Sequence, residues 1–134
     1  MTRKEENLQR LDELSELENG WISKSDMSGT KIHDKVIDFT RDLINKLEDE
    51  TSIYLFPIPS EPYGGVQIET DEISDLGSLE IEIYFENGNI ISDICFHPFL
   101  DDKNFVTNFS SNPNDLFNII CDFYNGSLYG KLNP

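Results

Sequence analysis

The sequence predicts an α+β fold, an antiparallel meander sheet of four to five strands with two N-terminal helices and one C-terminal helix packed on one face. Two segments near the N-terminus have apolar residues at helical spacing, and a third such segment follows Pro113. Between them, residues 79–96 alternate in polarity around Asn87-Gly88, the strongest short hairpin signal. Consecutive strands flanked by helices are typical of α+β proteins. At 134 residues we expect a single domain over 1–134.

The two N-terminal helices are expected over residues 3–18 and 31–48. The first has a narrow stripe of leucines and is followed by Asn19-Gly20, a suitable C-terminal cap. The second has Thr30 as a candidate N-cap and ends at the acidic Glu48–Glu50, which is the unfavourable sign for a helix C-terminus. This misfit indicates that the acidic charge does not serve helix stability.

The sheet is expected over residues 53–109. Prolines follow its first strand, Gly64-Gly65 precedes its second, and Asn87-Gly88 joins its third and fourth. The expected strands are Ile53–Phe56, Val66–Asp71, Leu79–Glu86, Asn89–Phe96 and a less regular fifth strand over 104–109.

The last helix is expected over residues 112–125. Ser111 or Asn112 can cap it, Pro113 suits its first turn, and Gly126 suits its end. The final residues, 127–134, are expected to fray.

The charge of the chain is strongly acidic and unevenly distributed. It carries 26 acidic against 10 basic residues, for a net charge of −16, and no lysine or arginine occurs between Lys46 and Lys103. A block of one sign repels itself but attracts cationic molecules over long range. Direct binding to nucleic acid or to an anionic membrane is disfavoured, because both need clustered basic residues. We therefore expect a basic protein as the partner.

The Asn-Gly turn allows the acidic residues of the sheet to be placed. With a two-residue turn, Glu82 pairs with Asp93 across the hairpin on the outer surface, and two like charges in that position destabilise a hairpin. If the second strand joins the sheet, its carboxylates share this surface. An ordinary solvated strand face is the alternative, but such faces usually mix charges and include lysine. The predicted partner-binding residues are Glu69, Asp71, Glu80, Glu82, Glu86 and Asp93, with Tyr84 among them as an aromatic anchor.

Catalytic and metal-binding patterns are weak. Glu80 and Glu82 would lie about 6–7 Å apart on one strand face, but paired carboxylates need a concave pocket and separated pKa values to act as acid and base. His33 and His97 have no partner at a ligand or triad spacing, so local structural roles are expected. We expect no enzyme, no metal and no cofactor.

Cellular location follows from the cysteines and the hydropathy. Cys95 and Cys121 lie in apolar runs and are expected to be buried reduced thiols. The N-terminus is polar, and no apolar run approaches the length of a membrane span. A soluble cytoplasmic protein is expected.

The order of motifs resembles a family of small uncharacterised bacterial and phage proteins. The shared features are a leucine-rich helix followed by Gly20-Trp21, then Pro57-x-Pro59, then the strand motif Gly64-Gly65-Val66-Gln67-Ile68-Glu69. The family has Asp-Gly where this chain has Ile22-Ser23. The resemblance implies the same fold and no particular activity.

These features predict a non-enzymatic acidic module that neutralises a basic, nucleic-acid-handling protein. An antitoxin, an immunity protein or a phage anti-defence inhibitor of the anti-CRISPR type fits this description, and mimicry of nucleic acid is one route to it. A structural or adaptor subunit that binds through its helices or Trp21 is the first alternative. A small hydrolase that uses Glu80 and Glu82 is the second.

Overall fold

The computed structural model describes residues 1–21, 29–58, 64–73, 75–98 and 106–132 of the chain. The sequence motif residues Pro59 and Ile22-Ser23, and the expected strand start at 104–105, lie outside these ranges. The elements in chain order are α1 (Arg3–Ser15), α2 (Asp34–Lys46), β1 (Ile53–Ile58), β2 (Gly65–Thr70), β3 (Ser78–Glu86), β4 (Asn89–His97), β5 (Thr107–Ser111), a 3₁₀ turn (Pro113–Asp115), α3 (Leu116–Tyr124) and α4 (Leu128–Leu132).

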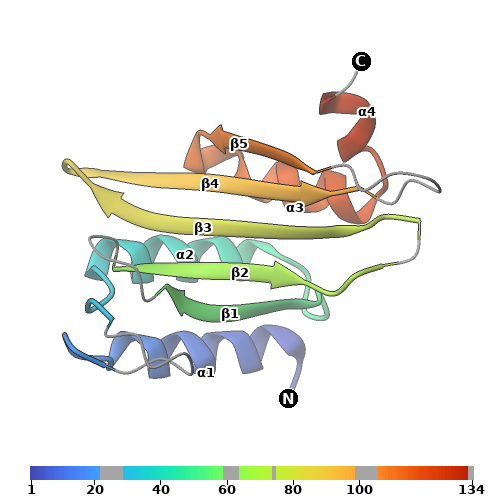
Figure 1. The fold of residues 1–134 in the computed structure, drawn as a ribbon. Helices are drawn as coiled ribbons and strands as arrows, with labels where there is room; N and C mark the ends of the chain where they lie inside the picture. The colour runs from blue at the N-terminus through green and yellow to red at the C-terminus, as the bar shows by residue number, and fades with distance from the viewer. Residues whose placement is uncertain (22–28, 59–63, 74, 99–105, 133–134) are drawn as a thin grey trace.

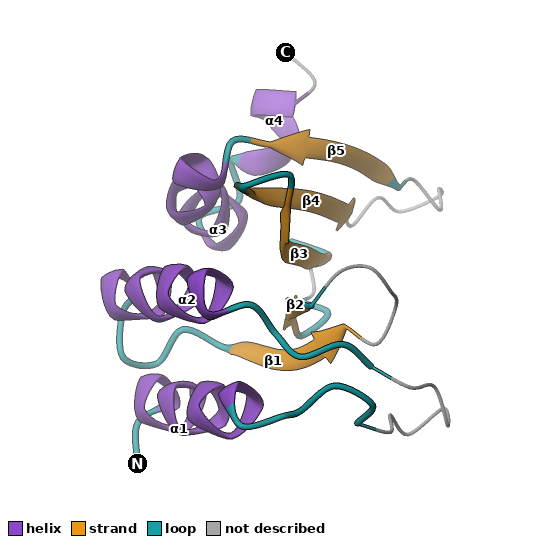
Figure 2. Ribbon diagram, turned by 90° about the vertical axis from the view of Figure 1, so that its left-hand side faces the viewer, coloured by secondary structure: helices purple, strands orange, loops and turns teal. Residues whose placement is uncertain are grey.

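The five strands form one antiparallel meander in the order β1-β2-β3-β4-β5, which confirms the α+β prediction. Helices α2 and α3 cover one face of the sheet, and α1 lies beside α2 and β1 (Figure 1, Figure 2). No described helix covers the opposite face, which we call the outer face (Figure 2).

The hydrophobic core lies between the sheet and the helices. In β3, Ile81 and Ile83 are fully buried, whereas the alternating residues Glu80 and Glu82 are exposed. This alternation follows from the period-2 geometry of a strand with one covered face. Apolar side chains of α2 and α3 complete the core, including Val36 and Phe123. The covered face of the sheet is thus fixed by burial, and the acidic residues must lie on the other one.

The β3–β4 turn has the geometry that the sequence predicts. Asn87 and Gly88 adopt positive φ angles of 53° and 82°, as a two-residue type I′ turn requires. The resulting register pairs Glu86 with Asn89 and Glu82 with Asp93. The predicted hairpin register is therefore confirmed.

Helix α1 ends earlier than predicted, at Ser15 and not at residue 18. The Ser15 hydroxyl donates to the carbonyl oxygen of Asp12 at 2.6 Å, a local bond that competes with helix continuation. Asn19 does not cap the helix. Its Oδ1 accepts a hydrogen bond from the Lys31 N–H at 2.7 Å and so joins two loops.

Helix α2 begins at Asp34, later than predicted, and its N-cap is His33 and not Thr30. The His33 Nδ1 atom accepts from the Lys35 N–H at 3.1 Å. The His33 N–H donates to the carbonyl oxygen of Gly64, which ties this segment to the loop before β2 in an extended conformation. A long-range contact therefore delays the start of the helix.

The C-terminal region differs from the prediction at its end. Asn112 caps the 3₁₀ turn that leads into α3, as expected, but Leu128–Leu132 form α4 and do not fray. Residues 133 and 134 of the segment expected to fray lie outside the described ranges. Leu128 is buried, and Lys131 Nζ pairs with Asp122 Oδ1 at 2.8 Å. Among the described residues, none of the helices combines the length and apolarity needed to cross a bilayer.

Candidate functional site

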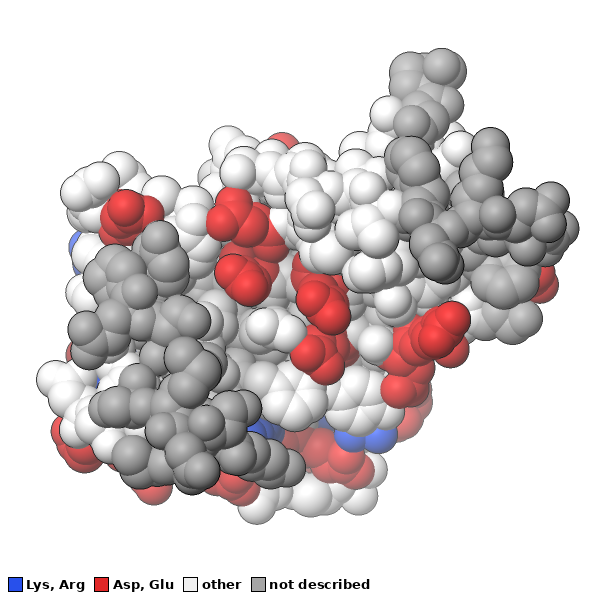
Figure 3. Space-filling view, viewed as in Figure 1, with Lys and Arg blue, Asp and Glu red and all other residues white. Residues whose placement is uncertain are grey.

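Four carboxylates of the outer face lie side by side on three neighbouring strands. Glu69 of β2 pairs with Glu80 of β3, and Glu82 of β3 pairs with Asp93 of β4. The second pair was predicted from the hairpin, and the first was not. We call these four residues the acidic cluster. Acidic side chains are seen over the strands in Figure 3, where lysine and arginine are visible below them, in the lower part of the view, and at the left edge.

Two further predicted residues lie away from the acidic cluster. Asp71 follows the end of β2, where the Tyr54 hydroxyl donates to its Oδ2 at 3.1 Å. Glu86 lies at the opposite end of the face, beside the hairpin turn. The structure therefore brings together four of the six predicted carboxylates and leaves the other two at opposite ends of the strands.

Tyr84 does not present its ring as the exposed anchor that we expected. Only 9% of the residue is exposed. A Cβ atom at Gly65 would lie 3.0 Å from the Tyr84 Cβ and 2.6 Å from the carbonyl oxygen of Ile83. Only glycine therefore allows β2 to lie this close to the Tyr84 Cβ.

The hydroxyl group of Tyr84 instead positions Asp93. It donates to Asp93 Oδ2 at 2.7 Å, and the Ser110 hydroxyl donates to Oδ1 at 2.8 Å. Both donors are neutral, so they fix the carboxylate and leave its charge uncompensated. Asp93 is thus held in one orientation on the outer face.

In the described part of the chain, the other members of the acidic cluster also have no ion-pair partner. Gln67 Nε2, a neutral donor, lies 2.5 Å from Glu69 Oε1. Each ion pair between described residues involves carboxylates of the helices or of adjoining loops, and none involves the acidic cluster. Among the described residues, the donors to Glu69 and Asp93 are therefore neutral, and the acidic cluster brings four carboxylates onto adjacent strand positions without a paired cation.

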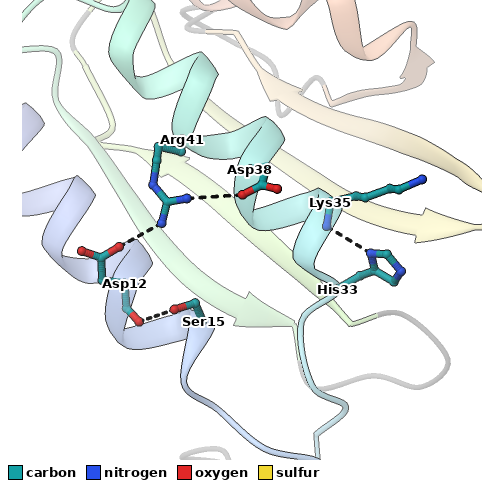
Figure 4. A network of polar contacts seen from close by, with 6 residues as sticks. All are labelled: Asp12, Ser15, His33, Lys35, Asp38 and Arg41. Carbon is teal, nitrogen blue, oxygen red and sulfur yellow. Dashed lines mark hydrogen bonds and ion pairs between the residues drawn. The ribbon is translucent and has the colours of Figure 1, made fainter.

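The helical side of the protein has a different charge pattern. Arg41 of α2 pairs with Asp12 of α1 at 2.9 Å and with Asp38 of its own helix at 3.4 Å (Figure 4). Here charges of both signs are interleaved, as on an ordinary solvated surface. Among the described residues, the two sides of the protein therefore differ in their charge pattern, with interleaved charges on the helical side and not in the acidic cluster.

Within the acidic cluster, the surroundings of Glu82 disfavour its ionised form. Partial burial of its carboxyl group raises its pKa, and the nearby charges of Asp93 and Glu80 raise it further. The residue as a whole remains exposed. A neighbouring cation would lower this pKa again, because it would favour the ionised form.

An open hollow of about 480 Å³ lies over β3, β4 and β5. Its polar lining comes from three members of the acidic cluster and from neighbouring strands, namely Glu80, Glu82, Asp93, Cys95, Asn108 and Ser110. The contribution of β5 was missed from the sequence because the strand was placed over 104–109 and runs over Thr107–Ser111. The register that pairs Ser110 with Asp93 depends on that shift.

Cys95 and His97 form a contact that the sequence analysis overlooked. Residues two apart on a strand lie on one face, and Cys95 Sγ is 3.3 Å from His97 Nε2. Burial, followed by the charges of Glu80 and Glu82, raises the pKa of the Cys95 thiol. This environment disfavours the thiolate that a nucleophile requires. Within the described ranges, no group of three or more His, Cys, Asp and Glu residues is arranged to hold a metal ion.

Aromatic residues of β1 border the acidic cluster. Tyr54 lies opposite Glu69, and Phe56, which is 40% exposed, lies opposite Gln67. The guanidinium group of Arg3 lies 4.7 Å from the centre of the Tyr54 ring. This position could have been predicted from the sequence, because side chains alternate along a strand and Tyr54 and Phe56 therefore lie on the same face.

Trp21 is accounted for by local packing. It is half-buried, and its indole Nε1 donates to the carbonyl oxygen of Thr30 at 3.0 Å. A Cβ atom at Gly29 would fall within the Trp21 ring, so the ring lies directly on that glycine.

Comparison of the chain with models of protein families, with curated proteins and with solved structures found no match.

Proposed function

We propose that the protein is a non-enzymatic binding module whose acidic cluster neutralises a basic, nucleic-acid-handling protein. The observation that carries this proposal is the two cross-strand pairs of like charge, Glu69–Glu80 and Glu82–Asp93. Neutral donors orient Glu69 and Asp93 without compensating their charge. Like charges directly opposite each other destabilise a sheet, by about 0.5 kcal/mol a pair. A partner that supplies cations would convert this repulsion into attraction.

The expected partner surface is a basic groove that otherwise holds phosphate groups. Acidic surfaces accelerate association with basic proteins and fix the orientation of the complex. The acidic cluster would occupy that groove and exclude nucleic acid from it. An antitoxin, an immunity protein or a phage anti-defence inhibitor would act in this way inside the cytoplasm.

Affinity capture from host lysate with a matched pair of charge variants tests the proposal. The test variant is Glu80→Lys with Glu82→Lys, and the control is Glu16→Lys with Glu18→Lys in the exposed segment after α1. Both change the net charge equally. Wild type and control should retain a basic protein that duplex DNA displaces, and the test variant should lose it. Equal capture by both variants, or a captured protein that DNA does not displace, would contradict the proposal.

One observation favours an adaptor role instead. On the helical side, a hollow of about 550 Å³ lies between the end of α2 and α3, and Phe117, Ile120 and Tyr124 are among its lining residues. Apolar binding at this hollow would respond little to ionic strength, whereas binding at the acidic cluster weakens strongly as salt rises. Capture at low and at high salt therefore separates the two functions.

A further inference from the structure

The two edges of the sheet are protected very differently. Strand β1 contains Pro57, and α1 packs beside it with the Arg10 guanidinium donating to the carbonyl oxygen of Leu55 at 3.3 Å. Proline, a basic side chain and a covering helix are devices that prevent an edge strand from pairing with another chain. The β1 edge is therefore closed to further strands.

Strand β5 shows none of these devices in the described part of the chain. Its five residues, Thr-Asn-Phe-Ser-Ser, include no charge and no proline, and the described residues give it a strand neighbour only in β4. It is the outermost strand of the sheet at the end opposite β1 (Figure 1). Alternate residues of an edge strand direct their N–H and C=O groups away from the sheet, where another strand can pair with them.

The position of β5 beside the acidic cluster indicates what would pair with it. Asn108 and Ser110 are exposed, lie opposite Cys95 and Asp93, and line the hollow together with Glu80 and Glu82. An added strand would lie about 4.8 Å beyond β5, hence about 10 Å from β4. The side chains of lysine and arginine are long enough to span much of that distance to Asp93.

We propose that the β5 edge accepts an extended basic segment of the partner protein as a sixth strand. This inference rests on the proposed function, which it deepens by naming the recognition mode, the addition of a strand to a sheet edge. Side chains of the added strand alternate between the two faces. Its outward residues would be basic and meet the hollow, and its inward residues would be apolar and lie beside Phe109, which packs against the core.

Charge complementarity distinguishes this occupant from a second copy of the chain. Pairing of two β5 strands would join two outer faces and bring two acidic clusters together, each on a chain with a net charge of −16. Such pairing adds repulsion and supplies no cation to Asp93. A basic segment would form hydrogen bonds with the backbone groups of β5 and would also compensate the negative charge of the acidic cluster.

The test uses three short synthetic peptides of equal charge with the full-length protein. The first alternates arginine and valine, the second has the same composition with the arginines grouped, and the third is the alternating peptide with alternate amide nitrogens methylated. Methylation removes the donors of the strand ladder without changing the charge. Affinity is measured by calorimetry, and the contact is located by amide chemical shifts and hydrogen exchange of Thr107–Ser111 and Ile53–Ile58.

We expect the alternating peptide to bind about tenfold more tightly than either control, as two or three net hydrogen bonds would give. It should slow hydrogen exchange in Thr107–Ser111 and not in Ile53–Ile58. Asn108→Lys should weaken this binding, and Asn118→Lys, an equal charge change at an exposed position of α3, should not.

Three results would overturn the inference. Equal binding of all three peptides without shifts in β5 would leave the proposed function standing as charge attraction alone. Shifts in β5 that depend on protein concentration without peptide would identify a second copy as the occupant. Failure of every basic peptide to bind at low salt would count against both the inference and the proposed function.

Discussion

Glu82 lies directly opposite Asp93 in the β3–β4 ladder, so two carboxylates that repel each other are held on neighbouring strands. The Tyr84 and Ser110 hydroxyls orient Asp93 without adding positive charge. Two carboxylates held on neighbouring strands maintain a negative electrostatic potential on the outer face, and this potential would attract a cationic partner.

Neutralising one member of this pair should stabilise the protein. We expect Glu82→Gln to raise the free energy of unfolding by about 0.5 kcal/mol, because it removes repulsion from Asp93 and Glu80. Urea denaturation at neutral pH measures the change, with Glu18→Gln, an exposed position, as the control. An equal effect of the two substitutions would show that only total charge matters.

The gain from Glu82→Gln should also depend on pH. The pKa of Glu82 in the folded protein is raised above its ordinary value of 4.5, chiefly by burial of the carboxyl group. A raised pKa means that the folded state binds the proton more tightly than the unfolded state. The contribution of Glu82 to the free energy of unfolding therefore falls as pH rises from about 4.5 through the folded pKa. The difference in stability between wild type and Glu82→Gln should therefore be smaller at pH 4 than at pH 7. A constant difference would contradict the electrostatic origin.

The Tyr84 hydroxyl should contribute more than an exposed tyrosine hydroxyl. We expect Tyr84→Phe to lower the free energy of unfolding by about 1.5 kcal/mol, since it leaves the partly buried Asp93 without one donor. Tyr54→Phe, which removes the exposed bond to Asp71, should cost about 0.5 kcal/mol. Thermal and urea unfolding of the two variants provide the comparison, and equal losses would argue against a positioning role for Tyr84.

Gly65 should tolerate no side chain. We expect Gly65→Ala to cost about 2 kcal/mol, because the new Cβ would lie 2.6 Å from the carbonyl oxygen of Ile83 and 3.0 Å from the Tyr84 Cβ. Gly130→Ala in α4 meets nothing within 4 Å and should be neutral or slightly stabilising. If Gly65→Ala unfolds at the same urea concentration as wild type, the close approach of β2 to Tyr84 is not tight.

Local signals in the sequence predicted the parts of the site that depend on neighbouring residues. The positive φ angles of Asn87 and Gly88 determine the hairpin register, and that register places Glu82 opposite Asp93. Alternation along β3 likewise predicted the burial of Leu79, Ile81 and Ile83, but not that of Tyr84.

The features that the sequence did not reveal depend on residues far apart in the chain. The close approach of β2 to the Tyr84 Cβ requires glycine at position 65 on the adjacent strand, and the start of α2 depends on the bond between His33 and Gly64. The contribution of Ser110 to the hollow depends on a shift of β5 by three residues at its start and two at its end. Single-sequence patterns carry no information about such pairings until the neighbouring element is placed.

The most direct test of the central claim is the affinity of the captured partner for the charge variants as salt is varied. The acidic cluster predicts that Glu80→Lys with Glu82→Lys abolishes binding while the circular dichroism spectrum stays unchanged. It also predicts that Glu16→Lys with Glu18→Lys binds nearly as wild type, and that wild-type affinity falls steeply with ionic strength. Wild-type affinity in the folded Glu80→Lys, Glu82→Lys protein would contradict the account.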